Sequence, residues 1–117
     1  MKDCKVNILG TEYRITVLKE SECPALKNAN GFMDSSVKQI VVDDFSCCIN
    51  DPTRKADLDS FQKKVIRHEV IHAFLAESGL EGSGLTVESW ADNEEMVDWF
   101  AIQSPKIYKV FAELDIM

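Results

Sequence analysis

The feature that most constrains this chain is a pair of histidines, His68 and His72, four positions apart and the only two in the sequence. On an α-helix, side chains at i and i+4 share one face, about 5–6 Å apart at Cβ, so both imidazoles can reach one metal ion. Glu69 lies roughly 100° around the helix from His68, where it can contact a metal-bound water without taking a coordination position. This HExxH spacing is typical of a zinc site with two histidine ligands and a general base.

Apolar residues surround the two histidines in the sequence and argue against a chance match to the pattern. Over residues 60–78 they fall on nearly every side of the expected helix, for example at Val65, Val70 and Phe74. A helix of this kind is usually buried. Two imidazoles and a carboxylate inside a protein are costly unless a metal ion or hydrogen bonds satisfy them. We therefore favour a metal site over simple packing of the histidines.

Length and composition are those of one soluble globular domain covering residues 1–117, because 45% of the residues are hydrophobic and 28% are charged. The net charge of −7 leaves no basic stripe, so we expect no nucleic-acid partner. Charges interrupt the first twenty residues, and no later segment is typical of a membrane span, so we expect a cytoplasmic protein that does not enter membranes. The four cysteines lack CxxC spacing and are expected to be free thiols.

Strand-forming runs come first in the chain. We expect a hairpin from the runs 6–9 and 13–18, divided by Gly10-Thr11. A short helical turn is expected within residues 20–29, followed by a second extended pair over 31–34 and 37–43.

Helix-forming runs follow the strands. Asp59, with Gln62 three residues later, predicts the start of a helix that runs to Ser78 and stops at Gly79. A second helix is expected over residues 88–103, and Pro105 is expected to open a third that continues through residue 114. The predicted fold is α+β, with a small antiparallel sheet packed on the HExxH helix and on two C-terminal helices.

A catalytic zinc ion usually has three protein ligands and one open position. Since there is no third histidine, the remaining ligand is expected to be a carboxylate or a thiolate. Glu94 and Asp98 are four residues apart, so one can bind zinc while the other accepts a hydrogen bond from a ligand imidazole. Glu94 is favoured as the ligand, and the alternatives are Glu95, Glu81, Glu88 or a cysteine.

The two motifs together resemble those of the gluzincins, and more narrowly of the ImmA/IrrE family of metallopeptidases, often carried by phages and mobile elements. The HExxH of His68–His72 is followed by an NExxxD pattern at residues 93–98 and by Phe100-Ala101. The resemblance spans about residues 31–103 and is strongest at the two motifs. It implies a zincin-like fold with His68, His72 and Glu94 as zinc ligands, Glu69 as general base and Asp98 in contact with the first histidine.

These residues predict a zinc-dependent endopeptidase that acts on a protein or peptide, and the resemblance implies a regulatory protein as substrate. Zinc would activate a water molecule and polarise the scissile carbonyl, while Glu69 would move the proton to the leaving amine. The alternative is a zinc-stabilised interaction module without proteolytic activity, for example a phage-encoded inhibitor of a host protein. The presence of Glu69 favours the peptidase, because a structural zinc site does not need that base.

Two parts of this mechanism stay open in the sequence. Residues 39–43 are either an edge strand that pairs with an extended substrate or an ordinary strand of the sheet. The developing oxyanion usually gains a second donor besides the metal. With no spare histidine, this donor is expected to be Tyr13, Tyr108, a cationic side chain or a backbone N–H.

Overall fold

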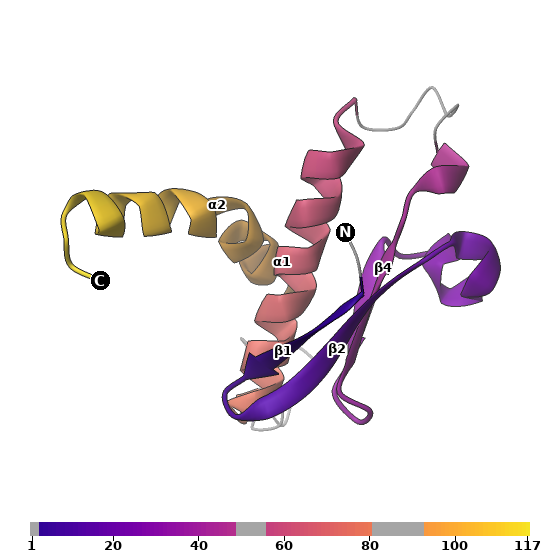
Figure 1. The fold of residues 1–117 in the computed structure, drawn as a ribbon, viewed down its shortest axis with the longest axis horizontal. Helices are drawn as coiled ribbons and strands as arrows, with labels where there is room; N and C mark the ends of the chain where they lie inside the picture. The colour runs from indigo at the N-terminus through magenta and orange to yellow at the C-terminus, as the bar shows by residue number, and fades with distance from the viewer. Residues whose placement is uncertain (1–2, 49–55, 81–92) are drawn as a thin grey trace.

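The computed structural model describes residues 3–48, 56–80 and 93–117. In these residues the fold is α+β, with four strands packed against one long helix and a second helix crossing it (Figure 1). The strands are β1 (Cys4–Ile8), β2 (Thr11–Leu18), β3 (Gly31–Asp34) and β4 (Gln39–Asp43). The helices are α1 (Leu58–Glu77) and α2 (Glu94–Glu113). The described residues also contain three short 3-10 helices: η1 (Glu20–Glu22), η2 (Pro24–Lys27) and η3 (Ser46–Cys48).

The first two strands form the predicted hairpin, with Ile8 paired to Thr11 across a two-residue turn. Both turn residues have positive φ, 50° at Leu9 and 93° at Gly10. A two-residue turn of this kind follows the right-handed twist of the strands. Asn7 Oδ1 also accepts a hydrogen bond from the Gly10 N–H at 2.8 Å. The predicted hairpin is therefore confirmed.

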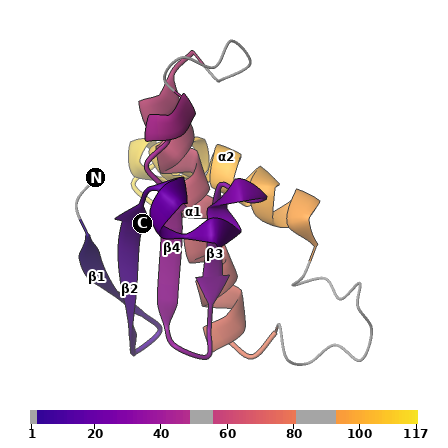
Figure 2. The same cartoon turned by 90° about the vertical axis from the view of Figure 1, so that its right-hand side faces the viewer.

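The four strands lie in the order β1-β2-β4-β3, which Figure 2 shows edge to edge in front of α1. The pairs β1–β2 and β3–β4 are antiparallel, but β2 and β4 run parallel, with Ile15 beside Ile40. The prediction of an antiparallel sheet is therefore wrong for its central pair. The reason is that β3 does not pair with β2. Instead, β4 lies between β2 and β3, antiparallel to β3 and parallel to β2.

The strand at residues 39–43 is therefore central, which excludes the edge-strand alternative and confirms that it is an ordinary strand of the sheet. Ile40, Val41, Val42 and Asp43 are all buried. A strand covered on both faces carries a continuous apolar run rather than alternation, as this one does. Among the described residues, β3 and β1 form the two edges of the sheet.

The core lies between one face of the sheet and α1. Tyr13, Ile40 and Val42 are fully buried on the sheet side, and Val65 and Ala73 meet them from α1. The helix buries only one face, because Phe74 remains 42% exposed. The expectation that α1 is buried on nearly every side is therefore wrong.

The helix α1 begins two residues earlier than predicted. Asp57, rather than Asp59, is the N-cap, and its side chain accepts a hydrogen bond from the Ser60 N–H at 3.0 Å. Gln62 does not close a capping box; its side-chain amide donates to the Asp43 carbonyl at 3.0 Å. The predicted stop is confirmed, since Gly79 has φ of 87° directly after the C-cap.

In the described residues 93–117 there is one continuous helix where parts of two were predicted. Pro105 lies inside α2 instead of opening a third helix. A proline cannot donate to the carbonyl four residues earlier, and Arg67 supplies the missing hydrogen bond through its Nε atom to the Ala101 carbonyl. Residues 88–92 of the predicted second helix lie outside the described residues. Neither described helix combines the length and apolar content needed for a membrane span.

Candidate metal centre

The two histidines lie side by side on α1, one helical turn apart. Their ring centroids are 4.9 Å apart, and the rings meet nearly edge to face. The His72 side chain is 11% exposed and that of His68 is 15% exposed. The α1 helix therefore presents a closely spaced and largely covered pair of imidazoles.

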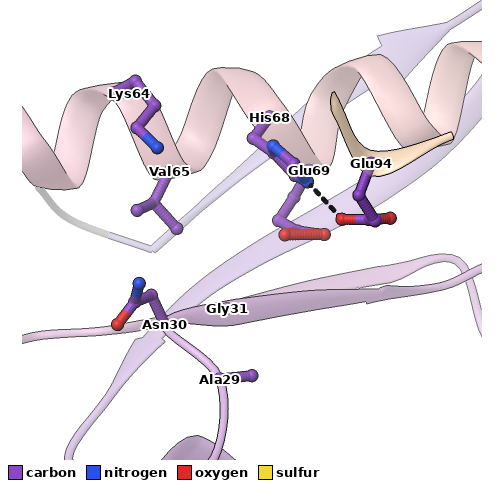
Figure 3. A pocket seen from close by; sticks show the side chains of 8 residues that line it. All are labelled: Ala29, Asn30, Gly31, Lys64, Val65, His68, Glu69 and Glu94. Carbon is purple, nitrogen blue, oxygen red and sulfur yellow. Dashed lines mark hydrogen bonds and ion pairs between the residues drawn. The ribbon is translucent and has the colours of Figure 1, made fainter. Parts of the chain in front are cut away.

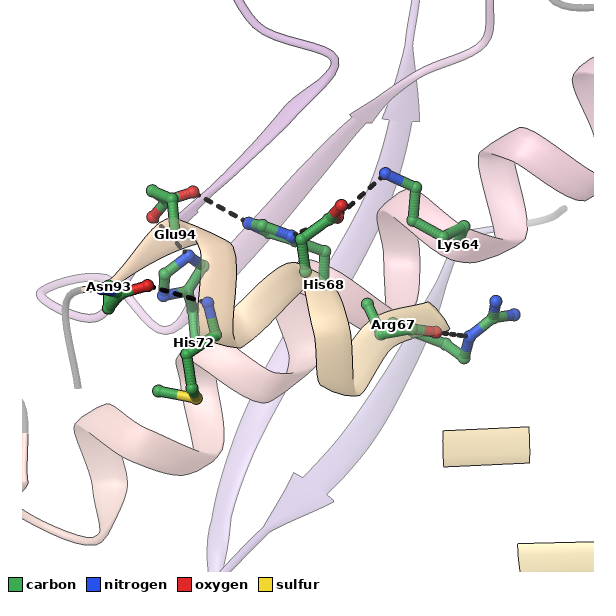
Figure 4. Close-up of polar contacts among 9 residues, drawn as sticks. Lys64, Arg67, His68, His72, Asn93 and Glu94 are labelled. Carbon is green, nitrogen blue, oxygen red and sulfur yellow. Dashed lines mark hydrogen bonds and ion pairs between the residues drawn. The ribbon is translucent and has the colours of Figure 1, made fainter. Parts of the chain in front are cut away.

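Glu94 approaches this pair from the first residue of α2. Its two carboxylate oxygens contact the two imidazoles, at 3.0 Å from His68 Nε2 and 2.9 Å from His72 Nε2 (Figure 4). Asn93 fixes the start of the helix, because its side chain caps the Met96 N–H at 2.8 Å. The cap holds Glu94 at the point where α2 meets α1.

These three side chains fit the requirements of a zinc ligand set. One ligand atom from each of His68, His72 and Glu94 lies within 4.8 Å of the other two. Two imidazole nitrogens and one carboxylate oxygen are the donors used by many catalytic zinc sites. The side chain of Glu94 is 70% exposed, so the group is open to solvent on the side of α2.

Asp98 contacts the other ring nitrogen of His68. Its Oδ1 lies 3.1 Å from His68 Nδ1 and accepts a hydrogen bond from Lys64 Nζ at 2.9 Å. The Lys64 hydrogen bond, with a smaller contribution from His68, lowers the pKa of Asp98 below its ordinary value. An ionised carboxylate at Nδ1 keeps the proton on that nitrogen and leaves Nε2 available to a metal.

Glu69 is buried beside the two histidines, between α1 and β3. Its burial raises the pKa of its carboxyl above the ordinary value, although His68 and His72 act in the opposite direction. Figure 3 shows its carboxylate near Glu94, facing the strand that begins at Gly31. A glutamate in this position is suited to accepting and returning a proton.

Two recesses flank Glu69 along β3, and both reach Gly31 and Glu94. The first has a volume of about 210 Å³ and is polar at its far end, where Asn30 and Lys64 lie. The second has a volume of about 300 Å³ and extends past Phe32 and Met33 toward His72. The candidate site is therefore a shallow groove that follows β3 rather than a deep cavity.

In the described residues, none of the other candidates for the third ligand lies in the group around the histidines. Glu95 is exposed and lines a recess with Asn93, Met96 and Trp99 on another side of α2. Glu81 and Glu88 lie outside the described residues. In the described part of the chain, no cysteine belongs to the group of possible ligands around the histidines.

The two tyrosines considered as oxyanion donors do not line the recesses beside the histidines. The Tyr13 ring is fully buried, and its hydroxyl donates to Glu77 Oε1 at 2.8 Å. Tyr108 is 60% exposed in the C-terminal half of α2. Of the cationic side chains, Lys64 lines the first recess, where its Nζ atom is bonded to Asp98.

Sequence reasoning missed three contributors to this region, namely Asn30, Gly31 and Lys64. It also missed a second group of possible ligands, formed by Glu20, Asp43 and Cys47, in which the Cys47 thiol lies 3.1 Å from Glu20 Oε2. The members of that group come from η1, β4 and η3. No short-range spacing in the sequence signals such a group.

Comparison of the chain with models of protein families, with curated proteins and with solved structures found no match in any of the three. The geometry of the site and the two motifs are therefore the observations that bear on the function of the chain.

Proposed function

We propose that this chain is a zinc-dependent peptidase with a zincin-like fold. In this proposal His68, His72 and Glu94 hold the metal, and Glu69 is the general base. The observation that carries it is the approach of both imidazole Nε2 atoms to the Glu94 carboxylate, at 3.0 and 2.9 Å, with Glu69 buried next to them. The resemblance of the two motifs to those of the ImmA/IrrE peptidases supports the same assignment.

When bound, zinc supplies a Lewis acid and lowers the pKa of a coordinated water toward about 7. The side chains of the protein transfer the proton and fix the tautomer of a histidine ligand. Glu69 takes the proton of the attacking water and returns it to the leaving amine, and burial raises its pKa toward the range in which both transfers are favourable. Asp98 holds His68 in the tautomer that offers Nε2 to the ion.

The substrate in this proposal is an extended peptide segment beside β3. Among the described residues, β3 pairs with β4 on one side only, so its other edge can pair with an added strand. Both recesses beside Glu69 follow this strand, and they would accept side chains on either side of the cleaved bond. This assignment moves the proposed substrate strand from residues 39–43 to β3.

A zinc-stabilised interaction module remains the second candidate, and one observation favours it. Neither Tyr13 nor Tyr108 lines the recesses beside the histidines, and the Lys64 amine is bonded to Asp98. The candidate that is left is a backbone N–H, and cleavage would be slow if none donates to the oxyanion. Both candidate functions require the chain to bind zinc, but only the peptidase cleaves peptides.

The test combines metal analysis with a cleavage screen of a peptide library by mass spectrometry. Wild type and Glu69→Gln should each hold about one zinc ion per chain, and only wild type should cleave peptides. Glu95→Gln is the matched control, because it changes an exposed glutamate outside the ligand group and should preserve both properties. A Glu69→Gln variant that cleaves as fast as wild type would overturn the peptidase proposal. A wild-type protein that binds zinc without cleaving would favour the interaction module.

A further inference from the structure

The helix α2 has two contrasting faces. Val97 and Ala101 are buried against the rest of the molecule, on the same side as Glu94 and Asp98. After Ala101, no residue of α2 is buried in the described structure. Figure 1 shows the C-terminal half of the helix running outward from the sheet and α1. The C-terminal half of α2 therefore buries no side chain against a hydrophobic core in the described structure.

The outward half of the helix nevertheless has an apolar face. Ile107, Val110, Phe111 and Leu114 occupy positions i, i+3, i+4 and i+7, which is the spacing of a helix–helix contact. Val110, Phe111 and Leu114 are 49%, 43% and 62% exposed. An isolated helical segment of about twelve residues is marginally stable in water. A contiguous apolar face on such a segment is typical of an interaction surface.

Charges along one flank of this face indicate the partner. Lys106 and Lys109 lie near the start of the segment, and Glu113 lies near its end, all within about 60° of one another around the helix. Asp115 comes after the C-cap Leu114, two residues beyond the last helical residue. In an antiparallel pair of identical helices, this flank faces the same flank of the other copy. The lysines of each copy then meet Glu113 of the other.

We propose that residues after Pro105 form an antiparallel interface between two copies of this chain. The two-fold axis passes between Val110 and Phe111, which brings Lys106 and Lys109 of each copy alongside Glu113 of the second copy. A parallel pair would bring the charged flank against the side that carries Tyr108, and the ion pairs would be lost. The whole chain has a net charge of −7, which disfavours an anionic lipid surface as the alternative partner.

This interface is independent of the candidate metal centre. Glu94 and Asp98 point toward α1, on the other side of α2 from the apolar face. Pairing through the C-terminal half therefore leaves the groove along β3 open, and zinc binding neither requires nor prevents it.

Sedimentation velocity of the full chain over about a hundredfold range of concentration tests the proposal. Wild type should shift from monomer to dimer, and Phe111→Ser combined with Leu114→Ser should stay monomeric. Because removing apolar side chains can also weaken the helix, the decisive test uses charges. Lys106→Glu with Lys109→Glu, or Glu113→Lys with Asp115→Lys, should each weaken the dimer about tenfold or more.

Mixing the two charge-reversed proteins in equal amounts should restore dimer formation, because each lysine again meets an acid. Lys5→Glu with Lys63→Glu is the matched control: it makes the same change in net charge on exposed lysines away from α2 and should leave the dimer intact. A wild type that is monomeric throughout would overturn the proposal. Charge reversals without effect, or a mixture that stays monomeric, would also overturn it. So would a monomer that binds lipid vesicles through the same apolar residues.

Discussion

At the scale of single residues, the imidazole of His68 is held from both sides by two carboxylates of α2. Asp98 contacts Nδ1 at 3.1 Å, and Glu94 contacts Nε2 at 3.0 Å. The two acids have different roles, because Asp98 is bonded to Lys64 while the exposed Glu94 is shared with His72. The arrangement separates a carboxylate that orients the histidine from one that can bind metal.

Asp98→Asn should therefore weaken zinc binding by about ten- to a hundredfold without removing a ligand. The asparagine keeps the shape but loses the charge that holds the proton on Nδ1. Competition with a chromophoric chelator measures the affinity. Glu94→Ala should cause a larger loss, because it removes a ligand. Equal affinities for wild type and Asp98→Asn would assign Asp98 a purely structural role.

Gly31 sets the distance between β3 and α1. A Cβ atom at this position would lie 2.9 Å from the Val41 carbonyl oxygen and 3.1 Å from Val65 Cγ1. Gly31→Ala should destabilise the protein by about 1–3 kcal/mol, since neither the strand nor the packed valine can move freely. Urea unfolding followed by circular dichroism measures the change. An unaltered midpoint would mean that β3 shifts outward without cost.

The residues of the site differ in how far the sequence predicts them. His68, Glu69 and His72 lie within one turn of one helix, so their spacing alone places them together. Glu94 required the docking of a second helix, and the sequence left several alternatives for it. Lys64 and Gly31 had no motif, because their contribution depends on contacts with Asp98 and β4 that only the packed structure creates.

At the scale of elements, α2 continues through Pro105 because α1 supplies the missing donor. Arg67 donates from Nε to the Ala101 carbonyl, which is the group that an ordinary residue at position 105 would have bonded. Arg67→Met should therefore cost about 1.5–3 kcal/mol of stability, the range of a hydrogen bond to a charged donor. Urea unfolding of the single variant measures this loss.

A double-mutant cycle separates this bond from general packing. In a Pro105→Ala background, the new backbone N–H can bond the Ala101 carbonyl, so Arg67→Met should then cost clearly less. An equal cost in both backgrounds would show that Arg67 stabilises the protein in another way.

The same contacts explain which elements the sequence could predict. The hairpin around Gly10 and the stop of α1 at Gly79 depend on local backbone geometry, and both were predicted correctly. The break at Pro105 was wrong, because the compensating donor comes from another helix. The sequence left the position of β4 open between edge and interior, although its buried run Ile40–Val42 is typical of an interior strand.

At the scale of the whole molecule, Glu77 ties three parts of the fold together. Its carboxylate accepts hydrogen bonds from Thr11 Oγ1 at 2.9 Å, Tyr13 Oη at 2.8 Å and Lys38 Nζ at 2.8 Å. Thr11 and Tyr13 belong to β2, Lys38 lies in the turn before β4, and Glu77 is the last residue of α1. The end of the helix is thus joined to the central pair of strands.

These hydrogen bonds should make the free energy of unfolding depend on pH in the acidic range. The hydrogen bonds from Lys38, Tyr13 and Thr11 lower the pKa of Glu77 from an ordinary value of 4.5 to about 2. The Glu77 carboxyl thus binds its proton more weakly in the folded protein than in the unfolded chain. The contribution of the Glu77 carboxylate to stability is therefore complete above pH 4.5. It is lost as the pH falls toward 2.

Glu77→Gln should therefore unfold at a lower urea concentration than wild type at neutral pH, and the difference should shrink between pH 4.5 and 2. Comparing the two proteins at each pH removes the contribution of other carboxylates that titrate in the same range, such as Asp98. Glu12→Gln is the control, because Glu12 is exposed and its nearest cation, Lys5, is 3.9 Å away. A stability difference for Glu77→Gln that stays constant down to pH 2 would mean that its carboxylate is not the acid-sensitive link, and that neutral contacts of the side chain hold α1 to the strands.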